Sequence, residues 1–280
     1  MFQKIFQSNQ LNKGKVVSFI NQKGGVGKTT LLFNTAHSLK NKGYRVLCLD
    51  MDPQGNLTEL MGAKLSESGC WQQLMNSVKE LSHLHRPVSF SQGLFQKDGL
   101  TLLPSHQLLS SFDLTVASLM SPRQLILKKM IEIHLLKRDY DFILLDAPPT
   151  LGLLMVNIVA ASDGVIIPFH TDRFSQQGLA HFHNMIDEVI DMQVGASPKI
   201  IGHIPNRVEG RKKSTQQSYQ EIADQLKGQF FFEPIPNKAA INQASLQQSS
   251  VFDFASRPYR ELQSHFDQIS AKIEESFHEC

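Results

Sequence analysis

The segment Lys23–Thr30, with the sequence KGGVGKTT, combines three glycines with two lysines and two threonines. Glycines let consecutive backbone N–H groups turn towards an anion, and a helix that follows them offers the positive end of its dipole. Lys28 is then placed to neutralise the outer groups of a polyphosphate, with Thr30 near a phosphate. The hydroxyl of Thr29 is placed to hold Mg²⁺, which prefers oxygen ligands and bridges phosphate oxygens. The segment therefore predicts a nucleotide phosphate site.

The flanking sequence supplies the elements that such a loop needs. The short apolar run Val16–Ile20 predicts a strand before it, and Lys28–Lys42 predicts a helix after it. Gly43 ends that helix, and Arg45–Leu49 predicts the next strand. A glycine turn that only joins a strand to a helix is the alternative. Because Gly-Lys-Thr-Thr follows a strand and opens a helix, we favour nucleotide binding.

The loop departs from the usual phosphate-loop pattern at one position. The pattern has a glycine five residues before Gly27, where this chain has Gln22, and a second lysine, Lys23, follows. Two lysines in one loop repel each other unless a strongly anionic ligand lies between them or one reaches elsewhere. A solvated surface lysine is the alternative. The position of Lys23 inside the loop favours a functional role.

A carboxylate closes the apolar run Asp141–Asp146, which is followed by Ala-Pro-Pro. An acid at the end of a buried strand emerges where ligands bind in open parallel sheets. Asp146 is therefore expected to serve Mg²⁺, through a water molecule. A helix N-cap is the alternative role for this residue.

Two further carboxylates, Asp50 and Asp52, follow the strand predicted at Arg45–Leu49. One of them could orient the attacking water in phosphoryl transfer. Turn formation by Asp52–Asn56 is the competing interpretation, and the two are compatible.

Apolar runs and helical runs alternate through the rest of the chain. Further strands are expected at Leu100–Leu103, Asp141–Leu145, Gly164–Pro168 and Lys199–Pro205. Helices are expected at Arg123–Lys137, Phe174–Met192 and Ser214–Lys227. This alternation predicts an α/β fold with a doubly wound, mostly parallel sheet. The segment from Leu57 to Gly99 has weak periodicity, and its fold stays open.

Composition describes one globular chain. The 280 residues are 41% apolar and 19% charged, which excludes disordered and fibrous classes. We expect a single domain over 1–280, with a short N-terminal extension at 1–15. The formal net charge of +2 means that attraction to nucleic acid must come from a local patch.

Three cysteines, Cys48, Cys70 and Cys280, lie far apart, which favours a reducing compartment over a disulfide framework or a zinc site. The residues from Met1 to Lys15 contain no long apolar run, and polar residues and prolines interrupt the apolar stretch Phe142–Ala161. Neither a signal peptide nor a membrane-spanning helix is predicted, so a cytoplasmic protein is expected.

Four motifs make the sequence similar to the ParA/MinD family of deviant Walker-A ATPases, and most like its ParA plasmid- and chromosome-partition branch. They are Lys23–Thr30, Asp50–Thr58, Tyr140–Gly152 and Gly164–Leu179. A fifth and weaker match, Pro234–Ala244, is similar to the segment beside the purine in that family.

The resemblance implies a mechanism in which two subunits form a homodimer around two ATP molecules. Lys23 would cross to the phosphates of the other subunit, Lys28 would hold those of its own, and Asp52 would hold the hydrolytic water. These three are the expected catalytic residues. Thr29 and Asp146 would serve Mg²⁺. Hydrolysis in the family is slow until a partner protein stimulates it.

The adenine side of the site is also implied by the resemblance, through Asn206 and Pro236. The full set of residues expected to bind nucleotide is Lys23, Gly24, Gly25, Val26, Gly27, Lys28, Thr29, Thr30, Asn206 and Pro236.

The ParA branch binds non-specific DNA as the ATP-bound dimer. Four basic residues against Glu209 give a local charge of +3, which suits phosphate contacts. The candidate DNA contacts are Arg207, Arg211, Lys212, Lys213 and Lys238. A solvated helix start is the alternative. Ala240 stands where the family usually has an arginine. Because the first predicted strand begins at Val16, we expect no N-terminal helix-turn-helix domain. Recognition of a specific site is then expected to belong to a separate ParB-like adaptor, and this protein is expected on the nucleoid.

The sequence leaves one other function open and disfavours two more. A ParA-like ATPase that positions a protein assembly has the same motifs. MinD-like membrane binding needs a basic amphipathic terminal helix, whereas the segment from Tyr259 onward has two basic and five acidic residues, so no stable membrane association is expected. A nitrogenase iron-protein type needs two suitably placed cysteines per chain, which we do not find.

Overall fold

The computed structural model describes residues 14–65, 71, 93–117, 122–192, 197–208 and 213–278. The segment whose fold the sequence left open, Leu57–Gly99, lies largely outside these ranges. The strands are β1 (Lys15–Phe19), β2 (Val46–Asp50), β3 (Phe95–Lys97), β4 (Leu100–Leu103), β5 (Phe142–Asp146), β6 (Gly164–Phe169), β7 (Lys199–Val208) and β8 (Ile235–Pro236).

These strands form one sheet in the order β3-β4-β2-β5-β1-β6-β7-β8. Every neighbouring pair is parallel except β3 and β4, which are antiparallel. The chain moves to one side of β1 through β2 and to the other side through β6, so the order reverses next to β1. The predicted doubly wound, mostly parallel sheet is confirmed, and its ligand crevice is expected at the carboxyl end of β1.

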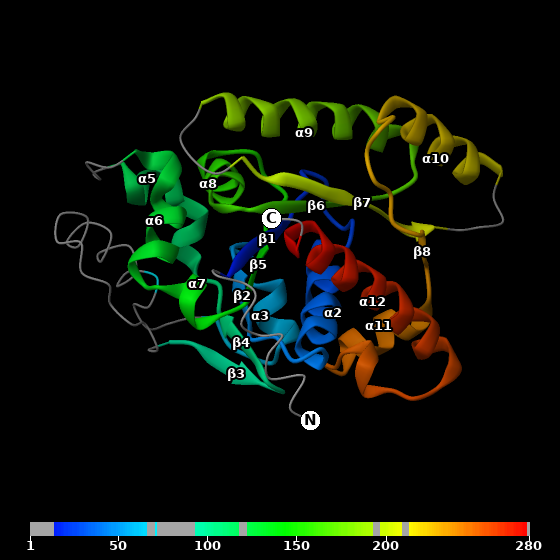
Figure 1. The fold of residues 1–280 in the computed structure, drawn as a ribbon, viewed down its shortest axis with the longest axis horizontal. Coiled ribbons are helices and arrows are strands. Elements are labelled where there is room, and N and C mark those ends of the chain that lie inside the picture. Colours follow the sequence, from blue (N-terminus) through cyan, green and yellow to red (C-terminus); the bar gives the residue numbers. More distant parts are fainter. Residues whose placement is uncertain are drawn as a thin grey trace.

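Helices cover both faces of the sheet. The α-helices are α2 (Lys28–Asn41), α3 (Asn56–Leu60), α5 (Phe112–Val116), α6 (Ile126–Ile133), α7 (Leu136–Asp139), α8 (Leu153–Ala161), α9 (Arg173–Asp191), α10 (Lys213–Gln225), α11 (Ala239–Leu246) and α12 (Arg257–His278). The 3₁₀ turns are η1 (Gln107–Ser111), η2 (Arg123–Leu125) and η3 (Val251–Asp253). Figure 1 shows β6 and β7 between α9 above and α12 below.

Strand β1 shows why the core has two halves. Val16 and Ile20 pack into the core under α5, α6, α8 and α9, whereas Val17 and Phe19 pack into the core under α2, α11 and α12. Successive side chains of a strand point to opposite faces, so a central strand that is covered on both sides is apolar throughout. This double burial fixes the loop after β1 between two packed layers.

The helix predicted over Arg123–Lys137 is wrong as a single element. The structure has η2, α6 and α7 there, and Leu135 between α6 and α7 has a left-handed φ of 55°. The amide of Leu135 donates to the Glu132 carbonyl, which closes α6. Leu136 is buried in the core. The break after α6 therefore directs this apolar side chain inward, which a straight continuation of the helix would not do.

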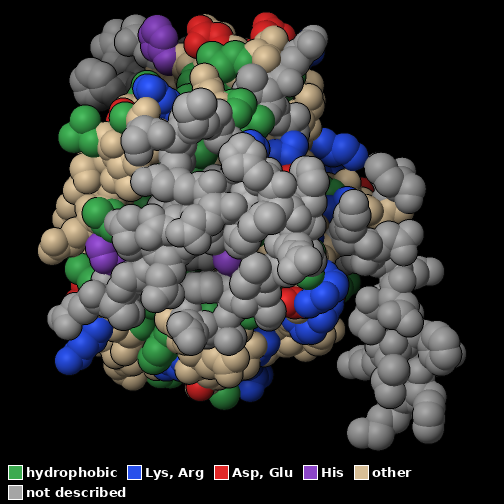
Figure 2. Space-filling view, turned by 90° about the vertical axis from the view of Figure 1, so that its left-hand side faces the viewer, with side chains coloured by type: hydrophobic (Ala, Val, Ile, Leu, Met, Phe, Trp, Pro, Cys, Tyr) green, Lys and Arg blue, Asp and Glu red, His purple; other side chains and the backbone are tan. Residues whose placement is uncertain are grey.

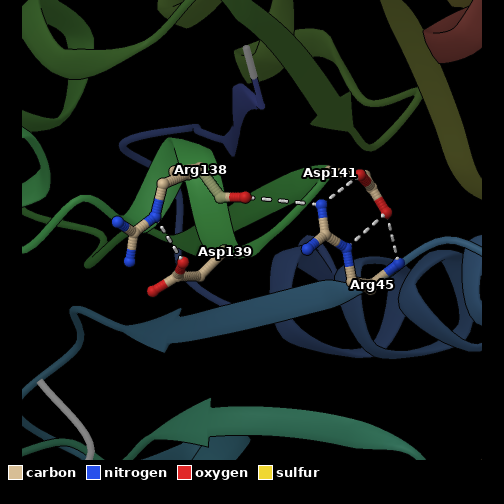
Figure 3. A network of polar contacts seen from close by, with 4 residues as sticks. All are labelled: Arg45, Arg138, Asp139 and Asp141. Carbon is tan, nitrogen blue, oxygen red and sulfur yellow. Dashed lines mark hydrogen bonds and ion pairs between the residues drawn. The ribbon is translucent and has the colours of Figure 1, made fainter. Parts of the chain in front are cut away.

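A polar network anchors the amino ends of two central strands (Figure 3). Asp141, just before β5, accepts hydrogen bonds from the backbone N of Arg45 at 2.8 Å and from its guanidinium at 2.8 and 3.2 Å. The guanidinium also donates to the Arg138 carbonyl, and Arg138 pairs with Asp139. The network holds β2 and β5 in register at the edge opposite to their carboxylates.

The apolar stripe of α12 packs inside the protein. Its buried residues are Tyr259, Leu262, Phe266, Ile269, Ile273 and Phe277. Full burial of a large apolar side chain contributes about 1.5–3 kcal/mol to stability, so this helix belongs to the core. Among the helices that the structure describes, none has the length and apolar character to cross a bilayer.

Candidate functional site

A cavity of about 550 Å³ opens at the carboxyl end of β1. The predicted loop contributes Gly24, Gly25, Gly27, Lys28, Thr29 and Thr30 to its wall. Asp52, Pro149 and Arg207 line it from the ends of β2, β5 and β7. The loop residue Val26 is buried beneath. Four strand ends thus converge on one cavity, as the order of the sheet requires.

Two loop glycines have backbone conformations that other residues rarely adopt. Gly25 has φ 75° and Gly27 has φ 92°, and Gly27 is the N-cap of α2. A Cβ on Gly27 would lie 2.3 Å from Nδ2 of Asn206. The loop can therefore turn its backbone into the start of α2 only with glycine here, which leaves the amino end of the helix open to an anion.

Lys28 is buried, with 7% of the residue exposed. Its Nζ donates to the backbone carbonyl of Asn21 at 3.0 Å, within the loop itself. Burial lowers the pKa of Lys28, while the charges of Asp146 and Asp52 act to raise it. A cation held by neutral carbonyls beside an anion cavity is placed to exchange one carbonyl for a phosphate oxygen.

Thr29 and Asp146 meet behind the cavity. The Thr29 hydroxyl donates to Oδ2 of Asp146 at 2.7 Å. The other oxygen, Oδ1, is buried and accepts no hydrogen bond from any residue that the structure describes. Burial raises the pKa of Asp146 well above its usual value, and the nearby Asp50 adds to this effect. A buried carboxylate with a spare oxygen next to a hydroxyl fits a hard cation such as Mg²⁺.

Both carboxylate oxygens of Asp50 accept hydrogen bonds, in contrast to those of Asp146. Its Oδ2 accepts hydrogen bonds from the Thr58 backbone N at 2.8 Å and from the Thr58 hydroxyl at 2.6 Å, and its Oδ1 accepts from the Asp52 backbone N at 3.2 Å. Burial raises the pKa of Asp50 to about 6. Asp50 and Asp146 are also register partners at the ends of β2 and β5. Asp50 thus shapes the start of the Asp52 turn.

Asp52 forms the turn that the competing interpretation predicted, since its Oδ1 accepts from the Gln54 backbone N at 3.0 Å. It also lines the cavity, with 7% of the residue exposed. The turn is therefore confirmed, and its geometry brings the carboxylate to the cavity. The role of Asp52 in holding water stays a prediction.

Lys23 does not line this cavity. Its Nζ forms an ion pair with Oδ2 of Asp172, just before α9. The two side chains are 38% and 39% exposed. Of the two possibilities that the sequence left for a pair of lysines, Lys23 follows the one in which it reaches elsewhere.

The expected adenine-side residues lie together beside the loop. Asn206 and Pro236 line a small pocket with Gly27 and Thr30. Nδ2 of Asn206 donates to the Val26 carbonyl at 2.8 Å, which ties β7 to the loop. Asn206 lies within β7 rather than after a strand ending at 205, because β7 extends to Val208 to pair with β8.

Among the candidate DNA contacts, Arg207 and Lys238 line the same small pocket beside the loop. Arg207 has φ 55° and lines the loop cavity, and Lys238 forms an ion pair with Glu261. Lys213 is the first residue of α10, whereas Arg211 and Lys212 lie outside the described residues. On the face in Figure 2, the described Lys and Arg side chains lie in small groups separated by other residues. Their role in DNA binding stays a prediction.

One residue near the loop, Asp172, was missed in the sequence, and Arg207 was predicted only as a DNA contact and not as part of the cavity wall. Asp172 follows β6 and pairs with Lys23, and Arg207 enters the cavity through an irregular pairing between β7 and β8. The rule that identified Asp146, an acid just past an apolar strand, applies equally to Asp172. No sequence signal marks the backbone bulge that redirects Arg207.

The chain is similar in sequence and fold to several known proteins. A family model described as an AAA domain matches residues 14–197. The chromosome-partitioning ATPase Soj of Thermus thermophilus is 30% identical over 271 residues, which cover 94% of this chain and 98% of Soj. A structure of McdA from Cyanothece in complex with ATP has a TM-score of 0.79 at 20% identity, over 93% of this chain and 96% of that one, and supports the fold. Cobyrinic acid a,c-diamide synthase of Mycobacterium smegmatis, with bound ADP and magnesium, has a TM-score of 0.69 at 28% identity, over 80% of this chain and 87% of that one.

The family model covers well over half of the chain, and Soj matches it along nearly its whole length. The glycine loop, the buried lysine and Asp52 line one cavity, and Asp146 lies behind it on Thr29. The chain belongs to the ParA/MinD family of P-loop ATPases.

Proposed function

We propose that this chain is a ParA-type partition ATPase, with 1–280 as one ATPase domain, that uses Mg²⁺ and ATP to segregate plasmid or chromosomal DNA. The observation that carries the proposal is the meeting of Thr29, Asp146 and Lys28 at one end of the sheet. The ADP and magnesium in the cobyrinic acid a,c-diamide synthase structure support the choice of ligands.

In this proposal, different residues at the cavity bind the phosphates, the metal ion, the attacking water and the base. The loop amides and Lys28 bind the phosphates, and Thr29 with Asp146 holds Mg²⁺, which supplies positive charge where negative charge develops during phosphoryl transfer. Asp52 orients the attacking water from the turn that follows β2. Asn206 and Pro236 lie against the base.

The ATP-bound form is proposed to be a homodimer that binds non-specific DNA on the nucleoid. Lys23 then contacts the nucleotide of the other subunit, and a ParB-like adaptor stimulates hydrolysis, which releases the dimer from DNA. The Soj relative supports a partition role. Burial of the apolar stripe of α12 supports a protein that does not associate stably with membranes, since that stripe is already covered.

The test is binding to random duplex DNA with ATP, with ADP and without nucleotide, across a salt series. The expected result is binding with ATP alone, with an affinity that falls steeply as salt rises, because phosphate contacts release counterions. Lys28→Ala serves as the control that cannot respond to ATP. Binding that is absent, flat in salt or independent of nucleotide would contradict the DNA-bound state.

A further inference from the structure

Arg207 lies where two hollows of the site meet. It lines the loop cavity and also the small pocket that contains Asn206 and Pro236. Gly27 and Thr30 line both hollows as well. A nucleotide with its base at Asn206 and its phosphates on the loop would therefore pass beside Arg207, whose guanidinium group suits phosphate oxygens.

The backbone at Arg207 is held in a conformation that fixes it to the loop. Its φ of 55° is left-handed, and the pairing of β7 with β8 is irregular between Asn206 and Val208. The Arg207 backbone N donates to Oδ1 of Asn206 at 2.9 Å, while Nδ2 of Asn206 donates to the Val26 carbonyl. One asparagine side chain thus holds both the arginine and the loop. Left-handed residues other than glycine are uncommon, and such strain concentrates at functional sites.

The basic groups near the loop differ in how they are paired. Lys23 forms an ion pair with Asp172, and Lys238 forms one with Glu261. The Arg207 side chain is exposed, and within the described part of the chain it has no ion pair or hydrogen bond. Its guanidinium group is therefore open to an anionic ligand.

The charge of Arg207 also acts on the loop side of the site. Burial lowers the pKa of His170, which follows β6, and the charges of Lys23 and Arg207 lower it further, while Asp172 acts to raise it. Nε2 of His170 is buried and has no hydrogen-bond partner among the described residues. Two basic side chains thus act on this imidazole against one carboxylate, which favours an anion beside them.

We propose that Arg207 binds the phosphate chain of the nucleotide on its own subunit, from the side that faces the base. The inference rests on the proposed function for its ligand, ATP. It assigns to the nucleotide a residue that the sequence placed among the DNA contacts. Because the phosphates nearest the ribose are common to ADP and ATP, Arg207 contributes equally to the affinity for both.

Arg207→Asn tests the inference, because asparagine tolerates a left-handed backbone and the variant removes the guanidinium group without straining β7. The affinity for ADP and that for ATP should each fall by roughly 10- to 100-fold, the range for a hydrogen bond to a charged group. Calorimetric titration with Mg²⁺ present measures both.

Two further variants serve as controls in the same titration. Arg207→Lys keeps a positive charge without the planar fork and should recover part of the lost affinity. Lys199→Gln, which removes an exposed charge at the opposite end of β7, should bind both nucleotides as the wild type does.

A DNA contact at Arg207 predicts a different result. With ATP raised until the variant is saturated, Arg207→Asn should bind random duplex DNA with the wild-type affinity and the same dependence on salt. Loss of a contact to a DNA phosphate would instead reduce the slope of log K against log salt by about 0.9 for each contact.

The outcomes separate this inference from the proposed function. Equal nucleotide affinity of Arg207→Asn and the wild type overturns the inference, and a reduced salt slope would then assign Arg207 to DNA. A loss with ATP but not with ADP, or equal losses in Arg207→Asn and Arg207→Lys, also overturns it. A wild type that binds ATP but not DNA contradicts the partition function, and the nucleotide titrations still decide the role of Arg207. A wild type that does not bind ATP overturns both.

Discussion

Thr29, the second residue of α2, donates a hydrogen bond from its hydroxyl to Asp146, the last residue of β5, at 2.7 Å. The two residues lie 117 positions apart in the chain. The contact brings together a residue of the glycine loop and a carboxylate from the neighbouring strand, and it leaves one buried carboxylate oxygen without a hydrogen bond from the described residues. It is the geometry from which magnesium binding is inferred.

Thr29→Ala should weaken the Mg²⁺-dependent part of nucleotide affinity by about 10- to 100-fold, as loss of a group that supports a metal site commonly does. Thr29→Ser keeps the hydroxyl and should restore affinity to near the wild-type value. Titration of nucleotide binding against Mg²⁺ measures both. An alanine variant with an unchanged Mg²⁺ dependence would remove Thr29 from the metal site.

Lys28→Ala should lower ATP affinity by at least about 10-fold, since hydrogen bonds to charged groups contribute roughly 1.5–3 kcal/mol. Calorimetric titration with ATP checks this result. Lys40→Ala, a change at the other end of the same helix, is the control and should bind normally. Equal affinity of the two variants would contradict the placement of the phosphates at Lys28.

Asp52→Ala should retain ATP binding and lose most of the ATPase activity, because the turn remains anchored by Asp50 while the carboxylate at the cavity is gone. Phosphate release under saturating ATP is the readout. The proposed function also expects this variant to stay on DNA once ATP is bound. Glu59→Gln, which alters another acid in the wall of the same cavity, should turn over normally. Normal turnover by Asp52→Ala would assign the water to another group.

The pKa of Asp50 predicts a pH dependence of stability. Burial raises this pKa from 3.8 to about 6, so the native state binds more protons than the unfolded state between these values. The free energy of unfolding therefore falls as pH rises through that window, by about 3 kcal/mol for this group.

Asp50→Asn removes that contribution. Between about pH 4 and pH 7 the wild type should lose about 3 kcal/mol more stability than the variant, measured by urea unfolding without nucleotide. Asp113→Asn, which alters an exposed acid, should follow the wild-type pH profile. Parallel profiles for Asp50→Asn and the wild type would show that Asp50 is already ionised throughout.

The polar network around Arg45 and Asp141 gives a prediction about the stability of the protein (Figure 3). Asp141→Ala leaves the Arg45 amide without its acceptor and removes a buried carboxylate, which should lower the free energy of unfolding by about 1–3 kcal/mol. Asp139→Ala removes only an exposed ion pair and should cost less than about 1 kcal/mol. Denaturant unfolding compares the two, and equal losses would contradict an anchoring role for Asp141.

The local sequence determined the chemistry of the loop and the class of fold. Glycine conformations at Gly25 and Gly27, the lysine and hydroxyl that follow, and the apolar runs that end in Asp50 and Asp146 all act within a few residues. Such features depend on backbone sterics and on strand and helix periodicity, which neighbouring residues largely set. The alternation of strands and helices then determined that these strand ends share one edge.

Tertiary structure decided the features that depend on contacts distant in sequence. Lys23 is 149 positions from Asp172, and only the β1–β6 pairing brings them together. The break at Leu135 follows from burial of Leu136 against the core, and Arg207 enters the cavity because β7 lengthens and bulges to pair with β8. A side chain finds such partners only after the sheet has assembled, because the free energy of each contact comes from groups that the local sequence does not contain.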